Sequence, residues 1–200
     1  MNELFSRGRT MKMSAYIYVF VLSICCFASY AQNSNKNLKF DRISMDPNKS
    51  IVENTEDSGN HKVLLAAINA TDLADILDKD GPFTVFAPSD LAFDKFTSTE
   101  MAVLLKPENK NKLRSLLTYH IVAGNFTASK LLQAMSRGKG TTTLTTVQGN
   151  KITATMSGID IVLTDSYGNT ARITTADANQ CNGVIHVIDS VILPQKYNLL

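Results

Sequence analysis

The segment that constrains the fold most is Val184–Leu193, which reads VIHVIDSVIL. Its first five positions are apolar except for His186. Because successive side chains of a strand point to opposite faces of the sheet, this pattern indicates a strand that is covered on both faces. Asn182-Gly183 is a turn signal directly before it. The sequence therefore predicts a central core strand that is entered through a turn.

A histidine inside an apolar strand can be a metal ligand, a catalytic base or a buried hydrogen-bonding residue. The chain has three histidines, His61, His120 and His186, and no pair has the i, i+4 spacing of a metal site. No third ligand accompanies the last two, which lie in different predicted strands. Buried polar groups need hydrogen-bond partners, so we expect His186 to be buried, neutral and bonded. We expect neither a metal nor a cofactor.

The N-terminus has the pattern of a secretory leader. Basic residues at positions 7–12 precede the uncharged apolar run Ala15–Phe27, and small residues at Ser29 and Ala31 suit signal peptidase. The pattern predicts a signal peptide over residues 1–31. The apolar run is shorter than the roughly 20 residues of a membrane span, and we find no longer run later in the chain.

A lipoprotein is the alternative interpretation of this leader, with Cys25 as the acylated residue. Leu22 stands in the right place for it, but Ile24 is bulky for the position before the cysteine. Simple cleavage after Ala31 is the interpretation we favour. We therefore expect the chain to be secreted, periplasmic or at the cell surface, with no transmembrane span after processing.

Removal of the leader changes the charge and the thiol content. It takes away three of the 20 basic and one of the 18 acidic residues, leaving 17 of each. No excess positive charge remains to neutralise phosphates, so nucleic acid is not an expected partner. Cys181 becomes a lone thiol, which we interpret as a small buried hydrophobic residue, with pairing to another chain as the alternative.

The rest of the chain divides into three parts. Residues 32–46 are polar and lack apolar periodicity, which predicts a flexible linker. Residues 47–195 form one domain, in keeping with a chain of 200 residues. Residues 196–200 are a C-terminal tail. Asn48, Asn69 and Asn125 begin N-x-[ST] sequons, whose use depends on the host.

Apolar residues recur with helical spacing in the first half of the domain. Ser50 is placed to cap a helix over residues 51–57, and a second helix starts near His61. Thr71 is placed to cap a third helix, which Gly81-Pro82 ends.

Two short apolar runs, Phe83–Ala87 and Thr118–Gly124, are predicted to be buried strands. A helix follows the first run, with Leu91 and Phe93 expected to point inward.

Further capping signals mark two later helices. Thr97 and Glu100 have the spacing of a capping box. Thr127 is placed to cap the segment ASKLLQAMSR, and Gly138 is expected to end this helix in the C′ role.

The second half of the domain changes to a period of two. Apolar and polar residues alternate over Ile152–Met156 and Ile159–Leu163, and Gly149-Asn150 is a hairpin signal before them. Helices followed by a run of antiparallel strands indicate an α+β domain rather than alternating βαβ units.

Nucleophilic catalysis has one candidate residue. Ser89 follows a predicted strand and opens a helix, as a hydrolase nucleophile would, and a histidine would have to serve as its base. The segment APSDL lacks the glycines of the G-x-S-x-G elbow, and an N-cap role explains the serine.

Three segments together resemble the fasciclin (FAS1) family: GPFTVFAPSDLAF at 81–93, LLTYHIVAG at 116–124 and NGVIHVIDSVILP at 182–194. The resemblance implies a wedge-like α+β β-sandwich of mostly antiparallel strands with helices on one side and edge. It also implies a non-enzymatic adhesion module that binds an extracellular or envelope protein or a glycan, with weak self-association. A structural accessory subunit of an envelope complex is the further alternative.

The resemblance assigns residues to two groups. Those that match adhesion motifs are Leu117, Tyr119, His120, Ile121 and Asp177. Those that match the fold signatures are Thr84, Phe86, Ala87, Pro88, Ser89, Asn182, Gly183, His186 and Asp189. Ala178 follows Asp177 where the family motif has isoleucine, so the apolar half of that motif is missing. For Tyr119 and His120 we favour a structural role, since leucines flank them.

Overall fold

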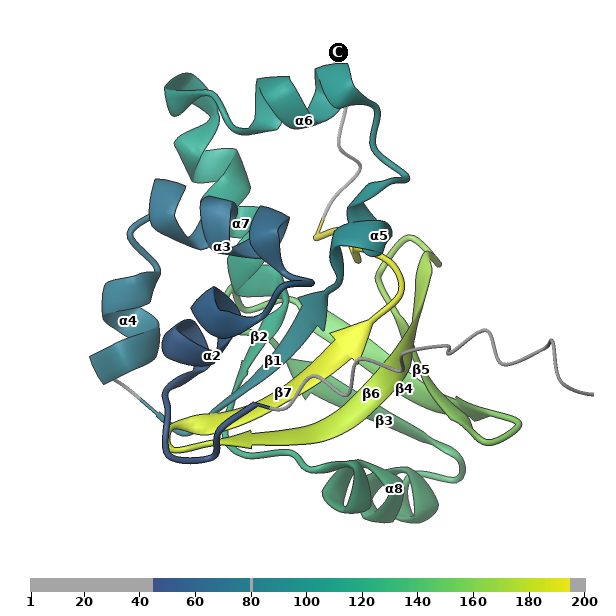
Figure 1. Cartoon of the computed structure of the whole chain (residues 1–200). Coiled ribbons are helices and arrows are strands. Elements are labelled where there is room, and N and C mark those ends of the chain that lie inside the picture. Colours follow the sequence, from purple (N-terminus) through teal and green to yellow (C-terminus); the bar gives the residue numbers. More distant parts are fainter. Residues whose placement is uncertain (1–44, 80, 195–200) are drawn as a thin grey trace, which may run out of the picture. The chain divides into compact units, whose positions relative to one another are not determined.

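The computed structural model describes residues 45–79 and 81–194, which belong to the compact unit Ile43–Leu200 (Figure 1). The predicted leader, most of the linker and the tail lie outside the described residues. The helices are α2 (Ile51–Asp57), α3 (Lys62–Ala70), α4 (Ala74–Lys79), α5 (Asp90–Phe93), α6 (Ser98–Leu104), the 3-10 helix η1 (Pro107–Asn109), α7 (Lys110–Tyr119) and α8 (Ala128–Arg137). The strands are β1 (Phe83–Pro88), β2 (Ile121–Ala123), β3 (Thr141–Thr145), β4 (Lys151–Ser157), β5 (Asp160–Thr164), β6 (Thr170–Gln180) and β7 (Gly183–Ile188).

The strands form one seven-stranded sheet in the order β2-β1-β7-β6-β5-β4-β3. Only the β1–β7 pair is parallel. Strand β7 lies between β1 and β6 and is buried at every position, which confirms the predicted central strand. It ends at Ile188, five residues earlier than expected.

Strand β6 joins the two halves of this sheet. Its first residues pair with β5, and the part from Ile173 to Gln180 pairs with β7. The register shifts between Ile173 and Thr175 and again between Thr175 and Ala178. Such irregularities bend a strand and increase its twist. At the far ends of the sheet, an isolated bridge joins Val122 of β2 to Thr146, so the sheet nearly closes on itself.

The two sides of β1 and β7 bury different clusters. Val85 of β1 and Ile185 of β7 belong to the cluster under α2, α3, α5 and α7, which we call the helical side. Phe86 and Ile188 belong to a second cluster with residues of β3, β4, β5 and α8, which we call the enclosed side. In Figure 1 the helices α2, α3, α4 and α7 lie together on one side of β1 and β7, whereas α8 lies near β3.

The predicted caps form as expected at three helices. Ser50 and Glu53 make a reciprocal capping box at α2, and Thr97 and Glu100 make one at α6. The Thr127 hydroxyl accepts a hydrogen bond from the Lys130 N–H at the start of α8. These bonds satisfy N–H groups that have no partner within a helix.

Two other predicted end residues have different roles. Thr71 does not cap α4; it ends α3, where its hydroxyl donates to the carbonyl of Ala67 at 2.8 Å. Gly138 ends α8 as expected, although it is the C-cap residue itself, with φ −90°, and not the residue after it. Glycine is needed there because a Cβ would lie 2.0 Å from the Thr141 carbonyl oxygen.

Two apolar residues also differ from expectation. Leu91 is 77% exposed, because α5 has only four residues and buries Ala92 and Phe93 instead. The segment predicted as a strand over Thr118–Gly124 begins in a helix: Tyr119 is the last residue of α7, and β2 covers only Ile121–Ala123.

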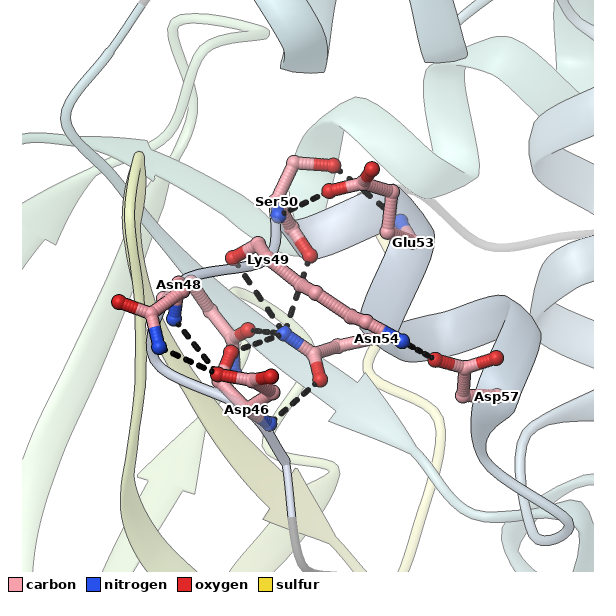
Figure 2. Close-up of polar contacts among 8 residues, drawn as sticks. Asp46, Asn48, Lys49, Ser50, Glu53, Asn54 and Asp57 are labelled. Atoms are coloured by element: carbon pink, nitrogen blue, oxygen red, sulfur yellow. Dashed lines mark hydrogen bonds and ion pairs between the residues drawn. The ribbon is translucent and has the colours of Figure 1, made fainter.

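A network of polar contacts around Asn54 of α2 joins the start of the domain to the β6–β7 region. Figure 2 shows the part of this network that lies between Asp46 and Asp57. The Asn54 side chain accepts from the Asp46 N–H and donates to the Asp46 carbonyl, both at 2.8 Å, and it also donates to the Gln180 side chain. From the turn, the Asn182 side chain accepts the Ile51 N–H at 2.9 Å. We call this group the Asn54 junction. It explains how residues far apart in the sequence are fixed at one end of β6 and β7.

Candidate interaction site

Tyr119 and His120 lie at the C-terminal end of α7 and are buried. The Tyr119 hydroxyl donates to the Lys151 carbonyl at 2.9 Å, which ties α7 to β4. His120 accepts the Ile192 N–H on Nε2 at 3.3 Å, so its proton is on Nδ1, which bonds the Leu116 carbonyl at 2.8 Å. Burial lowers the pKa of His120 to about 4, and the ring is neutral at physiological pH.

The two apolar members of the predicted adhesion motif are also inside the domain. Leu117 and Ile121 are buried in the helical-side cluster. Four of the five adhesion candidates therefore contribute to packing and hydrogen bonding. Because these four side chains are buried, they support the surface residues around them but are not themselves exposed to a partner.

Asp177 is the exposed member of the adhesion group. It lies in the irregular part of β6, where its backbone adopts a φ of 59°, a left-handed conformation that aspartate tolerates better than most residues. Its Oδ1 accepts the N–H of Ala128, the first residue of α8, at 2.7 Å. Its own N–H donates to Nδ1 of His186 at 3.3 Å. The carboxylate is thus held at a fixed place next to the start of α8.

His186 supports this arrangement from inside, because its other ring nitrogen, Nε2, donates to the Phe126 carbonyl at 2.8 Å. The ring stacks on Phe86, with centroids 5.7 Å apart. Burial lowers its pKa. The expectation that His186 is buried, neutral and hydrogen bonded is confirmed in its geometry, and the Asp177 and Phe126 partners show what it connects.

The other signature residues hold β1, β7 and their neighbours together. Thr84 donates to the Gly124 carbonyl at 2.7 Å and accepts the Phe126 N–H at 2.8 Å. A Cβ on Gly183 would lie 2.0 Å from the Phe83 carbonyl oxygen. Three of the remaining members, Phe86, Ala87 and Pro88, are buried in β1. Ser89 stands at the N-cap position of α5, but its side chain makes no capping hydrogen bond there. Asn182 belongs to the Asn54 junction, and Asp189 accepts the Arg172 N–H at 2.8 Å.

Cys181 is exposed, so the expectation of a buried thiol was wrong. It lies in the turn between β6 and β7, where its backbone N–H donates to the Lys49 carbonyl at 3.0 Å. The backbone is fixed there while the side chain faces solvent.

Ser89, the candidate nucleophile, is the N-cap of α5, and its backbone N–H donates to the Ile188 carbonyl at 3.2 Å. Both ring nitrogens of His120 and of His186 are bonded to backbone atoms. Neither ring has a nitrogen left to accept the Ser89 proton, which a base must do.

Sequence reasoning did not single out Asn54 or the pair Ser58 and His61. Asn54 carried a signal, because asparagine is unfavourable inside a helix unless its side chain has partners. The Ser58 hydroxyl bonds Nδ1 of His61 at 2.7 Å at the start of α3, and burial lowers the pKa of that histidine.

The described residues also border two hollows. An open one of about 530 Å³ lies between α5, α6 and the β5–β6 turn and includes Lys95, Phe96 and Asn169 in its lining. A smaller one, of about 240 Å³, lies beside α4 and α7. In residues 45–79 and 81–194 we find no cluster of three metal-binding side chains. No helix within those residues is long and apolar enough to cross a membrane.

Comparison with known proteins places this geometry in a family. The profile of the Fasciclin domain matches residues 59–194, and the chain therefore belongs to the fasciclin family. It is 35% identical to protein sll1483 of Synechocystis over 82% of this chain and 83% of that protein. It is 27% identical to human periostin, of which it covers 21%. The family expectation from the three segments is confirmed.

The fold is confirmed by a solved structure. The FAS1 domain pair of the insect cell adhesion molecule Fasciclin I matches with a TM-score of 0.65 at 21% identity, over 74% of this chain and 51% of that chain. The expected α+β FAS1 fold is thus the observed one.

Proposed function

We propose that this protein is an exported, non-enzymatic FAS1 module that binds a protein or a glycan outside the cytoplasm. Family membership and the likeness to a cell adhesion molecule support an adhesive role. The predicted leader supports export. A hydrolase that uses Ser89 with His120 or His186 is disfavoured, because the ring nitrogens of both histidines are committed to backbone hydrogen bonds.

The observation that carries the proposal is the placement of Asp177. It is the exposed member of the adhesion group, and residues 174–176 next to it are exposed as well. Its Oδ1 is used by Ala128, whereas its Oδ2 makes no hydrogen bond to the residues that the structure describes. We infer that a partner donates to Oδ2 from a cationic or hydroxyl group. A carboxylate whose position is already fixed loses little conformational freedom on binding.

The test uses the chain from Gln32 and measures its retention on native envelope or matrix material and on a glycan array. Asp177→Asn keeps an oxygen that can accept the Ala128 N–H but removes the charge. Because hydrogen bonds to charged groups contribute about 1.5–3 kcal/mol, we expect roughly 10- to 100-fold weaker binding. Asp75→Asn, on exposed α4, is the matched control.

The melting temperature separates binding from folding in this test. We expect Asp177→Asn to melt close to the unchanged chain. If Asp177→Asn and Asp75→Asn bind equally well, the partner does not bind at Asp177. Binding to none of the materials would contradict the adhesive role as a whole.

A glycan is the partner that the open hollow would suit. Phe96 offers an apolar ring there, and Lys95 and Asn169 offer polar groups. If the glycan array gives the signal, Asn169→Ala should reduce it more than Asp177→Asn does. If the envelope or matrix protein gives the binding signal, Asp177→Asn should reduce that signal more than Asn169→Ala does. A stable stoichiometric complex with one envelope protein would favour the accessory-subunit alternative.

A further inference from the structure

The cavity of about 240 Å³ on the helical side has an apolar wall. Most of its lining residues come from α4, from α7 and from the first residues of β1 and β2. The wall is formed by Leu73, Ile76, Leu77, Phe83, Ile121 and Val147. Ligand cavities are mostly apolar with a few polar groups that fix orientation, and this cavity has that composition.

Two residues of α7, Arg114 and Thr118, supply the polar part of the lining. The Thr118 hydroxyl donates to the carbonyl of Arg114 at 2.8 Å, so it is committed to its own helix. Arg114 is half-buried and donates from one guanidinium nitrogen to the Thr71 carbonyl at 3.2 Å. A guanidinium has five N–H donors, so most of its capacity is left for a ligand.

The charged side chain in the lining of the cavity is the cation Arg114. The carboxylate that influences Arg114 is Asp72, which forms an ion pair with Lys110. Asp75 and Asp78 of α4 are exposed, and the described residues form no ion pair with Arg114. A ligand with an anionic group would therefore complement the charge of Arg114.

We propose that the cavity binds a medium-chain aliphatic carboxylate, with the chain against the apolar wall and the carboxylate on Arg114. A cavity of about 240 Å³ is slightly below the usual size range of ligand pockets, which favours an aliphatic chain of moderate length over a larger ligand. Arginine binds carboxylates in a bidentate geometry. This ligand site is separate from the surface at Asp177 and goes beyond the proposed adhesive role.

Isothermal titration calorimetry on the chain from Gln32 tests the site with three probes of equal chain length. These are octanoate, octanol and octyltrimethylammonium. We expect octanoate to bind at least tenfold more tightly than octanol, and the cation to bind least. Binding of octanoate should also raise the melting temperature.

Two variants separate the parts of the site. Arg114→Gln should weaken octanoate at least tenfold and leave octanol binding unchanged. Val147→Trp fills the cavity from a position that is 44% exposed, so the fold should tolerate it, and it should abolish binding of both probes. Arg137→Gln, on α8, is the matched control and should change nothing.

Three results would overturn the proposal: no octanoate binding at millimolar concentration, octanol bound as tightly as octanoate, or octanoate binding that survives Val147→Trp. None of these results bears on adhesion through Asp177. Loss of adhesion in Asp177→Asn with octanoate binding intact would likewise leave this site standing.

Discussion

The helical side and the enclosed side of β1 and β7 are held together in different ways. On the enclosed side, Phe86 and Leu163 are fully buried, and the sheet nearly closes around them. On the helical side, short helices depend on capping boxes and on the Asn54 junction, and they border a cavity of about 240 Å³. The difference suggests that the enclosed side carries more of the stability, and that the helical side is where a ligand can be accommodated at a lower cost.

The largest effect should come from truncating a packed leucine on the enclosed side. We expect Leu163→Ala to lower the free energy of unfolding by about 3–5 kcal/mol, because its neighbours in the sheet have little freedom to close the void. Leu77→Ala, at the cavity on the helical side, should cost only about 2 kcal/mol, since that wall is already incompletely packed. Urea unfolding of the two variants measures both values. Equal costs, or the reverse order, would remove the contrast between the two sides.

A substitution of His186 measures what the buried polar contacts contribute to the stability of the enclosed side. We expect His186→Ala to lower the free energy of unfolding by about 1–3 kcal/mol, because it leaves the Asp177 N–H and the Phe126 carbonyl without their partner. Thermal melting of the variant, beside His61→Ala on the helical side, is the measurement. An unchanged melting temperature together with lost partner binding would instead make His186 a binding residue.

The pH dependence of stability should show the buried histidines directly. His120 has its pKa lowered to about 4 by burial, against about 6.5 in the unfolded chain. Below pH 6.5 the unfolded state binds a proton that the folded state does not, so stability falls as pH falls toward 4. His120 alone should cost about 2 kcal/mol between pH 7 and pH 5.

Urea unfolding at pH 7, 6 and 5 checks this expectation. His61 and His186 have lowered pKa values as well, so they act in the same direction. We expect His120→Gln to be less stable at pH 7, but its free energy of unfolding should depend less on pH than that of the unchanged chain. A stability that is constant from pH 7 to pH 5 would contradict neutral buried histidines.

Local signals in the sequence predicted much of the fold. The two apolar faces of β7, the caps at Ser50, Thr97 and Thr127, and the hairpin at Gly149-Asn150 each depend on a few neighbouring residues. Such signals act within one element, so the sequence alone can identify them. The three segments that resemble the fasciclin family supplied the fold as a whole, which local signals do not contain.

The errors arose where the decision depends on distant residues. The run Leu116–Gly124 is apolar for most of its length, so periodicity could not show that α7 continues to Tyr119. Cys181 is exposed in a turn whose backbone is bonded to Lys49, more than a hundred residues away, and no local pattern indicates that contact. Asp177 could be named from the motif, but its position next to α8 depends on the register shifts of β6, which no local pattern gives.

The smallest effect should come from the helix caps, and it sharpens the comparison between the two sides. We expect Ser50→Ala to lower the free energy of unfolding by about 1 kcal/mol, because it breaks the capping box of α2. Thr127→Ala, at α8 on the enclosed side, should cost about half as much. Its single bond to Lys130 is long, at 3.3 Å, and the Asp177 carboxylate also accepts an N–H at this helix end. Urea unfolding of Ser50→Ala, Thr127→Ala and Thr127→Ala with Asp177→Ala tests this, since the double variant should lose more than the sum of its parts. Simple additivity would mean that the two side chains stabilise the start of α8 independently, and the expectation that one cap compensates for loss of the other would be wrong.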